Sequence, residues 1–160
     1  YSATAAIANF SASASVDYDS SSVPIKIGLI MDNSNRLELS YQSIKESDSS
    51  LEAETVSGVN LDYKLLIEEP KVGSFTPYGV VGLGLYEWEN TAQYFVGDEN
   101  LEGIQWGAGV GGVYGVDNSL ELETSLQYKK INWQDVKVGA VTITSDNSGY
   151  EFYLGLNYKL

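Results

Sequence analysis

Apolar and polar residues alternate one by one through most of this 160-residue chain. The final segment, SGYEFYLGLNYKL (residues 148–160), shows the pattern clearly. Every even position from Tyr150 to Leu160 is apolar or aromatic, whereas the odd positions include Glu151, Asn157 and Lys159. A period of two is the side-chain period of a β-strand. The chain is therefore predicted to be all-β, and the open question is whether the apolar face of each strand points inward or outward.

Eight such segments can be marked, at residues 3–16, 23–31, 36–44, 54–67, 75–89, 102–116, 119–132 and 148–160. The connections between them alternate strictly between longer and shorter ones. An up-and-down barrel with short turns at one rim and longer loops at the other has this arrangement, and a Greek-key sandwich does not. We therefore expect one domain over residues 1–160, built as an antiparallel up-and-down barrel of eight strands.

The charged residues on the polar faces of these strands indicate which face points inward. The bases number five and so do the acids, in a chain whose formal net charge is −13: Lys26, Arg36, Lys64, Lys129 and Lys159 against Glu38, Asp62, Glu121, Glu123 and Glu151. A solvent-exposed face would inherit the overall excess of acid, whereas a closed interior must balance its ions, because unpaired buried charges are costly. We therefore predict that the polar set faces the interior and that the apolar set faces lipid, as in an eight-stranded transmembrane β-barrel.

Composition excludes several functions. The excess of 22 carboxylates over 9 basic residues argues against nucleic-acid partners. The chain has no cysteine and no histidine, so it lacks disulfides, thiolate metal sites and the commonest general base. No apolar run is long enough for a spanning helix, and no secretion leader opens the chain, so we expect this to be the mature form if the protein is exported. The acids outside the strand interior gather mainly in the longer connections, giving a predicted acidic rim: Asp17, Asp19, Glu46, Asp48, Glu52, Glu54, Glu87, Glu89, Asp98, Glu99, Glu102, Asp135 and Asp146.

Three patterns could suggest chemistry, and each has a plainer interpretation. GAGVGG (Gly107 to Gly112) matches the dinucleotide fingerprint but lies within a strand, where inward glycines make room for large side chains such as Tyr86 and Tyr153. Glu121 and Glu123 resemble a glycosidase pair, but we expect them to be ion-pair partners of Lys129, Lys159, Lys26 or Arg36. Acidic groups such as 98–99 and 146–147 offer oxygen ligands without a calcium-binding loop. We predict no catalytic residue, no metal site and no cofactor.

Aromatic residues are predicted to form two girdles on the outer face. Those near the longer loops are Tyr41, Trp88, Tyr94, Trp106 and Trp133, and those near the short turns are Tyr63, Tyr114 and Tyr158. The first strand is the least regular, because residues 1–8 and 10–16 alternate in opposite phases. A bulge near residues 8–9 would reconcile the two halves.

The chain resembles the small eight-stranded outer-membrane barrels, the family that includes the OmpA transmembrane domain and OmpX. The most specific likeness is the C-terminal assembly signal, which Tyr153, Gly155, Tyr158 and Leu160 match, with Leu160 in place of the usual Phe. The stretch 75–90 also looks like the fifth strand of this family. The resemblance implies the outer membrane of a Gram-negative bacterium, and insertion from the periplasm by the outer-membrane assembly machinery through the C-terminal strand. The partners it implies are the lipid bilayer and lipopolysaccharide.

These observations predict a monomeric integral membrane protein with a side-chain-filled interior and acidic outer loops. Its expected role is structural or interactive, in envelope integrity or adhesion, and not enzymatic. Two alternatives remain open at this point. One is a narrow channel for ions or small solutes, and the other is a soluble ligand carrier of lipocalin type, which would line its interior with apolar residues.

Overall fold

The computed structural model describes residues 2–7, 10–15, 22–31, 34–45, 55–89, 100–138 and 141–159, the first two of these ranges by their backbone alone. Every regular element in these ranges is a β-strand, and none of them holds a helix that could cross a membrane. The strands are β1 (Ser2–Ile7), β2 (Phe10–Ser15), β3 (Ile25–Ile30), β4 (Asn35–Lys45), β5 (Thr55–Leu66), β6 (Phe75–Trp88), β7 (Leu101–Gly115), β8 (Leu120–Trp133), β9 (Val136–Val138) and β10 (Val141–Tyr158).

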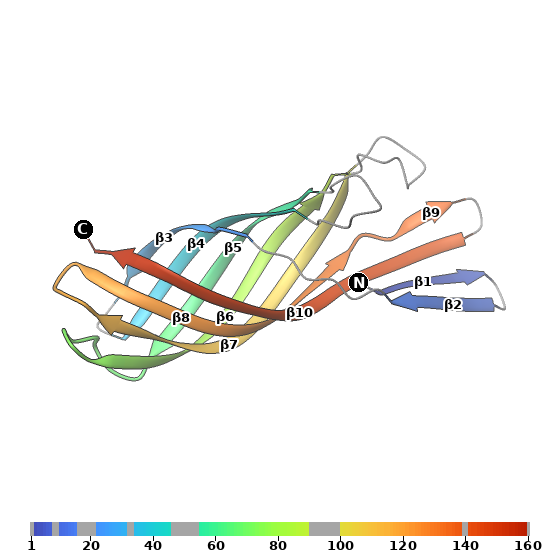
Figure 1. Ribbon diagram of the computed structural model, residues 1–160. Helices are drawn as coiled ribbons and strands as arrows, with labels where there is room; N and C mark the ends of the chain where they lie inside the picture. Colours follow the sequence, from blue (N-terminus) through green and yellow to red (C-terminus); the bar gives the residue numbers. More distant parts are fainter. Residues whose placement is uncertain are drawn as a thin grey trace.

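All these strands belong to one antiparallel sheet, which follows the chain as a meander from β3 to β8 and on to β10 (Figure 1). The ladder between β8 and β10 is unbroken from Asn132 opposite Asp146 to Leu120 opposite Tyr158. β9 pairs with the beginning of β10, and so does β1, which in turn pairs with β2. The described sheet therefore ends at two edge strands, β2 and β3.

The structure confirms the predicted all-β antiparallel sheet and seven of its strands, β3 to β8 and β10. The predicted start of the last strand is wrong, because β10 begins at Val141 and not at residue 148. Residues 141–144 alternate valine or isoleucine with threonine, and these β-branched side chains favour an extended backbone. Most of the predicted loop at 133–147 is therefore strand.

The prediction of a single first strand over residues 3–16 is also wrong. Residues 2–7 and 10–15 form two strands that pair with each other, with Ile7 opposite Phe10. The two halves alternate in opposite phases, and a chain reversal between them accommodates this without a bulge. The described residues therefore form an open sheet and do not show eight strands paired into a closed barrel.

Two of the short connections have turn chemistry that is evident in the sequence. In the turn between β7 and β8, the Asp117 carboxylate accepts hydrogen bonds from the backbone N–H groups of Ser119 (2.7 Å) and Leu120 (2.8 Å). In the connection between β5 and β6, Gly73 has a φ of 75°, a backbone conformation that favours glycine. Its N–H donates a hydrogen bond to the carbonyl of Gly115 at 2.7 Å. These turns fix the register of the strands that they join.

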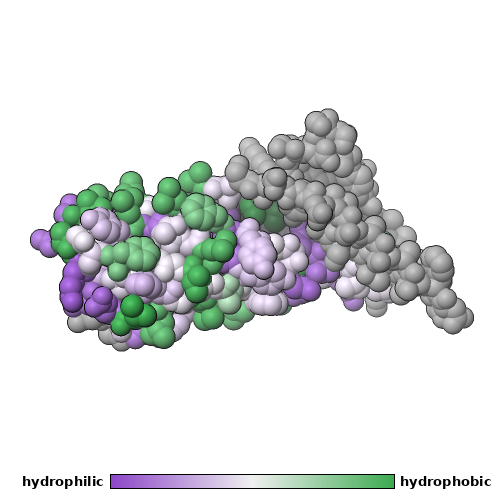
Figure 2. All heavy atoms as spheres, turned by 60° about the horizontal axis from the view of Figure 1, so that its bottom comes forward, coloured by the Kyte–Doolittle hydropathy of each residue, from purple (hydrophilic) through white to green (hydrophobic). Residues whose placement is uncertain are grey.

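The sheet is strongly curled, and its two faces have opposite character. Arg36 on β4 contacts Glu121 on β8 although three strands lie between them in the sheet, so these side chains meet across a concave face. Lys64 and Glu123 on that face are 1% exposed, whereas Leu83 and Leu154 on the convex face are 65% and 70% exposed. Apolar side chains gather on the outside, as Figure 2 shows. The predicted assignment of the polar set to the interior is confirmed for these strands.

Two apolar clusters accompany the polar residues inside the curl. One gathers where strands lead into the longer connections and consists of Val56, Tyr86, Leu101 and Trp133, with Trp88 packed against it. The other contains Leu66, Tyr78, Val80 and Val113. The rings of Trp88 and Trp133 lie 5.7 Å apart. Trp133 is 4% exposed and Trp88 packs against the same inner cluster, so their predicted places in an outer aromatic girdle are wrong, and Tyr94 lies outside the described residues.

Candidate functional site

The candidate site is the set of charged side chains on the concave face, which we call the concave network. It comprises the ten residues predicted from the charge balance together with their polar partners. Directly opposite neighbours in the sheet carry like charges: Arg36 faces Lys64, and Glu38 faces Asp62. Like charges at opposite positions repel, so each needs a counter-ion from elsewhere. The curl of the sheet brings counter-ions for the two bases, Arg36 and Lys64, from β8.

The first group joins Arg36, Glu121 and Lys159. Two guanidinium nitrogens of Arg36 donate to the two carboxylate oxygens of Glu121, at 2.6 and 3.0 Å. Lys159 Nζ lies 2.7 Å from the same carboxylate, which is completely buried. A paired, two-point contact of this kind is the strongest form of arginine–carboxylate interaction. Two cations thus share one anion, and Glu121 has two of the partners predicted for it.

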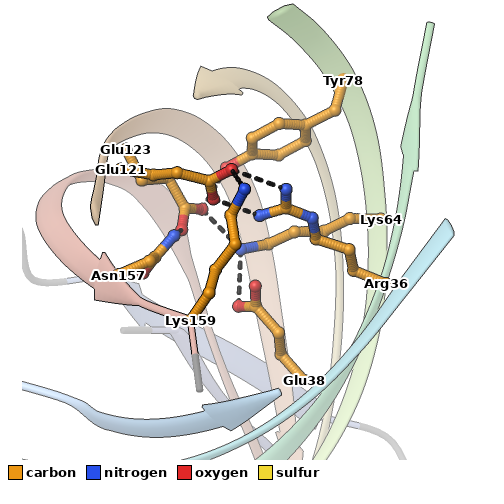
Figure 3. Close-up of polar contacts among 8 residues, drawn as sticks. All are labelled: Arg36, Glu38, Lys64, Tyr78, Glu121, Glu123, Asn157 and Lys159. Carbon is orange, nitrogen blue, oxygen red and sulfur yellow. Dashed lines mark hydrogen bonds and ion pairs between the residues drawn. The ribbon is translucent and has the colours of Figure 1, made fainter. Parts of the chain in front are cut away.

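The second group is centred on Lys64 (Figure 3). Its Nζ lies 2.5 Å from a carboxylate oxygen of Glu38 and 2.5 Å from one of Glu123. Glu123 also accepts hydrogen bonds from the Tyr78 hydroxyl and from the Asn157 amide, the latter at 2.7 Å. Lys64 was not among the partners predicted for Glu123. Here two anions share one cation, which offsets the excess of base in the first group.

The third group holds Glu151, which pairs with Lys129 at 2.8 Å and accepts from Gln42 Nε2 at 3.0 Å. The carbonyl of Gln42 accepts from the Tyr86 hydroxyl at 3.1 Å, and that hydroxyl accepts from Asn60 Nδ2 at 2.7 Å. The chain of contacts therefore runs from β10 through β4 to β6 and β5. It links the ion pair to the apolar cluster around Tyr86.

Lys26 and Asp62, the two remaining predicted charges, make no ion pair with another described residue. Lys26 Nζ lies 3.5 Å from the centroid of the Tyr153 ring, a cation–π contact between β3 and β10. Asp62 is buried, and no described residue donates a hydrogen bond to its Oδ1. That oxygen lies against Gly82, where a Cβ atom would overlap it, so the close neighbour is a glycine Cα–H, a weak donor.

Glycines make this dense packing feasible. Gly107, Gly109 and Gly111 lie in β7, so the GAGVGG motif is a strand, as predicted. A Cβ at Gly111 would come within 2.5 Å of the Tyr78 ring, and one at Gly109 within 2.8 Å of the Gln127 side chain. The predicted role of these glycines, making room for large inward side chains, is confirmed, but the predicted Tyr86 and Tyr153 are not the side chains concerned, because they lie against Gly58 and Gly155.

The arrangement binds the two sides of the curled sheet together. Side chains from β3, β4 and β5 contact side chains from β8 and the C-terminal strand in every group described above. Glu121 and Glu123 are at most 1% exposed, so a substrate has no access to them in this geometry. Among the residues that the structure describes, no group of three or more histidine, cysteine, aspartate or glutamate side chains could hold a metal ion.

Sequence reasoning assigned Gln42 and Asn157 to the inward polar faces but did not count them, or Tyr78, among the members of the network. Gln42, Tyr78 and Asn157 each donate to, or accept from, one of its groups. All of them occupy inward positions in the same period-two alternation that identified the charges, so extending the count to every polar inward residue would have found them. Of the predicted assembly signal, Tyr153 and Gly155 face the concave side, Tyr158 is exposed on the convex side, and Leu160 lies outside the described residues.

Comparison with known proteins adds no family to this description. No protein-family model matches the sequence, and searches of curated proteins and of solved structures find no significant match.

Proposed function

We propose that the protein is an integral outer-membrane β-barrel whose convex face lies in the hydrocarbon of the bilayer. The observation that carries this proposal is the inverted distribution of polarity. Lys64, Glu121 and Glu123 are buried, while apolar side chains such as Leu83, Phe152 and Leu154 are more than 60% exposed. In water an exposed apolar surface of this extent is a strong liability, whereas in lipid it is the favourable arrangement.

The height of the apolar surface fits a bilayer. Along β6 the outward side chains from Phe75 to Leu85 carry no charge, and the next outward residue is Glu87. The ten residue-to-residue steps from Phe75 to Leu85, at about 3.3 Å each and tilted by about 40°, span roughly 25 Å, the height of the apolar band in outer-membrane barrels. Glu102 on β7 faces Glu87 at the same level, so the polar boundary continues onto the next strand.

A β-sheet that lies in the bilayer must also close into a barrel. Unpaired backbone groups cannot remain at a sheet edge within hydrocarbon, because lipid offers them no hydrogen bonds. We therefore propose that an eighth strand closes β3 to β8 and β10 into a complete barrel. The concave network supports this because its ion pairs already draw β4 and β5 toward β8 and β10.

The function that we propose for this barrel is structural or interactive, in envelope integrity or surface adhesion. The interior is occupied by paired charges and packed apolar clusters, which suits a scaffold better than a carrier with an apolar cavity. Acidic residues such as Glu87 and Glu102 lie at the rim of the longer connections, where they would meet lipopolysaccharide headgroups. The C-terminal strand would engage the assembly machinery, and the barrel would act as a monomer.

Tryptophan quenching in lipid tests this proposal. Trp106 lies on the convex face and is 43% exposed, whereas Trp133 is 4% exposed inside the curl. In vesicles whose acyl chains carry bromine, a variant that retains Trp106 alone (Trp88→Phe/Trp133→Phe) should be strongly quenched. The matched variant that retains Trp133 alone should be quenched much less. A chain that stays monomeric in water without detergent, with Trp106 unaffected by brominated lipid, would contradict the proposal.

A further inference from the structure

A groove crosses the convex face from β5 to β8, where the apolar band meets the polar row next to it. We call it the boundary groove, and its volume is about 590 Å³. Its floor is the main chain of one row of paired residues: Gly58, Tyr86, Gly103 and Trp133. The Tyr86 and Trp133 rings are buried inside, so that row turns its side chains away from the groove. A hollow of this size is large enough for a small ligand or a lipid headgroup.

The two walls of the boundary groove have opposite chemistry. One wall is the outward row of Val59, Leu85 and Ile104, which are paired across β5, β6 and β7 and are all exposed. The other wall is the next outward row, in which Glu87 on β6 is directly opposite Glu102 on β7. The groove is therefore amphipathic across its width, with hydrocarbon on one side and carboxylates on the other.

No cation among the described residues accompanies the two carboxylates of the polar wall. Like charges directly opposite on neighbouring strands have Cβ atoms about 5 Å apart and repel each other. Asn100 donates to Glu87, whereas the Glu102 carboxylate makes no hydrogen bond or ion pair with another described residue. Lys130 on the adjacent strand β8 is already paired with Asp146 at 3.0 Å. A cationic group from outside the chain would relieve the repulsion between Glu87 and Glu102.

A side-chain amide lies at the β8 end of the groove. Asn132 is directly opposite Ile104 and is exposed, and its amide has no hydrogen-bond partner among the described residues. Asn132 is a diagonal neighbour of Glu102, at a separation of about 7–8 Å between the main chains. The amide offers two N–H donors, which suit an anionic oxygen. The groove thus presents an acceptor for a cation and, close to it, a donor for an anion.

We propose that the boundary groove binds a phospholipid whose headgroup carries a primary ammonium, as in phosphatidylethanolamine. The ammonium donates to Glu87 and Glu102, the neighbouring phosphate accepts from Asn132, and an acyl chain lies along Leu85 and Ile104. This inference rests on the proposed position of the convex face in lipid, and it names a lipid for that face. A metal ion alone would leave the apolar wall uncovered, and an anionic headgroup alone would be repelled by the carboxylates.

Trp106 can report which lipid occupies the groove, because it is the outward residue next to Ile104 on β7. The full chain with Trp88→Phe/Trp133→Phe is refolded in mixed vesicles in which only one headgroup class carries brominated acyl chains. At equal mole fraction, brominated phosphatidylethanolamine should quench Trp106 more than brominated phosphatidylcholine. The two headgroups have the same net charge, but only the ethanolamine has N–H donors. We expect a relative association constant on the order of fivefold in its favour.

Carboxylate substitutions test whether the polar wall causes this preference. Glu87→Gln/Glu102→Gln should abolish it, because the wall then carries no charge. The matched control is Glu68→Gln/Glu69→Gln, two exposed acids in the connection between β5 and β6, which should retain the full preference. Glu102→Lys should shift the preference toward the anionic headgroup of phosphatidylglycerol. A preference for ethanolamine that survived the substitutions at Glu87 and Glu102 would refute the inference.

The quenching pattern separates this inference from the proposed function. Equal quenching of Trp106 by brominated ethanolamine and choline lipids would leave the proposed function intact and overturn only the inference. Absence of quenching by every brominated lipid would contradict the proposed function itself. A preference for brominated phosphatidylglycerol that required calcium and disappeared with a chelator would indicate a divalent cation bridging an anionic headgroup, and it would likewise overturn the inference.

Discussion

Glu121→Gln removes the one anion that two cations share, and the structure gives the size of the expected effect. The carboxylate is completely buried, and the Arg36 side chain that binds it at two points is 9% exposed. Lys159 is 29% exposed and can turn toward solvent, so most of the loss comes from leaving Arg36 buried without a counter-ion. Breaking a buried pair on one side lowers the free energy of unfolding by about 3–5 kcal/mol, and we expect a loss in that range.

Equilibrium urea unfolding of the protein in lipid vesicles, followed by tryptophan emission, measures this loss. The double variant Arg36→Met/Glu121→Gln should recover most of it, because replacing both partners removes the unpaired charge. The matched control is Glu68→Gln, whose partner Lys71 lies 3.7 Å away with both side chains more than half exposed, and which should change stability by less than about 1 kcal/mol. If Glu121→Gln also fell within that limit, the buried network would not be holding the sheet together.

Three further predictions concern the two faces and the interior. Leu154→Arg on the convex face should destabilise the protein in lipid by about 2–4 kcal/mol, measured by the same unfolding assay, and a neutral result would argue against a lipid-facing position. Gly111→Val should clash with the Tyr78 ring and lower the unfolding midpoint, whereas Gly79→Val, at a position with no neighbour within 4 Å, should not. The intact protein should give no steady conductance in planar bilayers, because paired charges fill its interior, and a stable single-channel current would favour a narrow channel.

The period-two alternation predicted most of the sheet because each strand has one polar and one apolar face. It predicted which side of β4, β5 and β8 points inward, since only a balanced set of charges is tolerable there. It offered the same four candidate bases for Glu121 and Glu123, which include both partners of Glu121 but not Lys64, the partner of Glu123. Lys64 contacts Glu38 on the adjacent strand β4, but it reaches Glu123 on β8 because the sheet curls, and that distance across the interior depends on strand tilt and register.

The errors have physical causes as well. The pattern treated Trp133 as a girdle residue because of its residue type, but it follows the inward phase of β8 and packs beside Trp88. Residues 133–147 were predicted to be a loop because Asp, Asn and Gly punctuate them, although β-branched residues at 141–144 extend β10. At the N-terminus the change of phase between Ile7 and Phe10 marks a reversal, where we expected a bulge.

Site-directed spin labelling tests the central claim, the orientation of the convex face toward lipid, most directly. Nitroxides at Leu122, Leu126 and Leu154, all exposed apolar positions, should be relaxed efficiently by oxygen dissolved in the bilayer and shielded from a water-soluble nickel chelate. Labels at Glu87 and Glu102, on the polar row next to the apolar band, should show the opposite preference. If the nickel chelate relaxed labels at the three leucine positions as strongly as labels at the two glutamate positions in vesicles, the account would be contradicted.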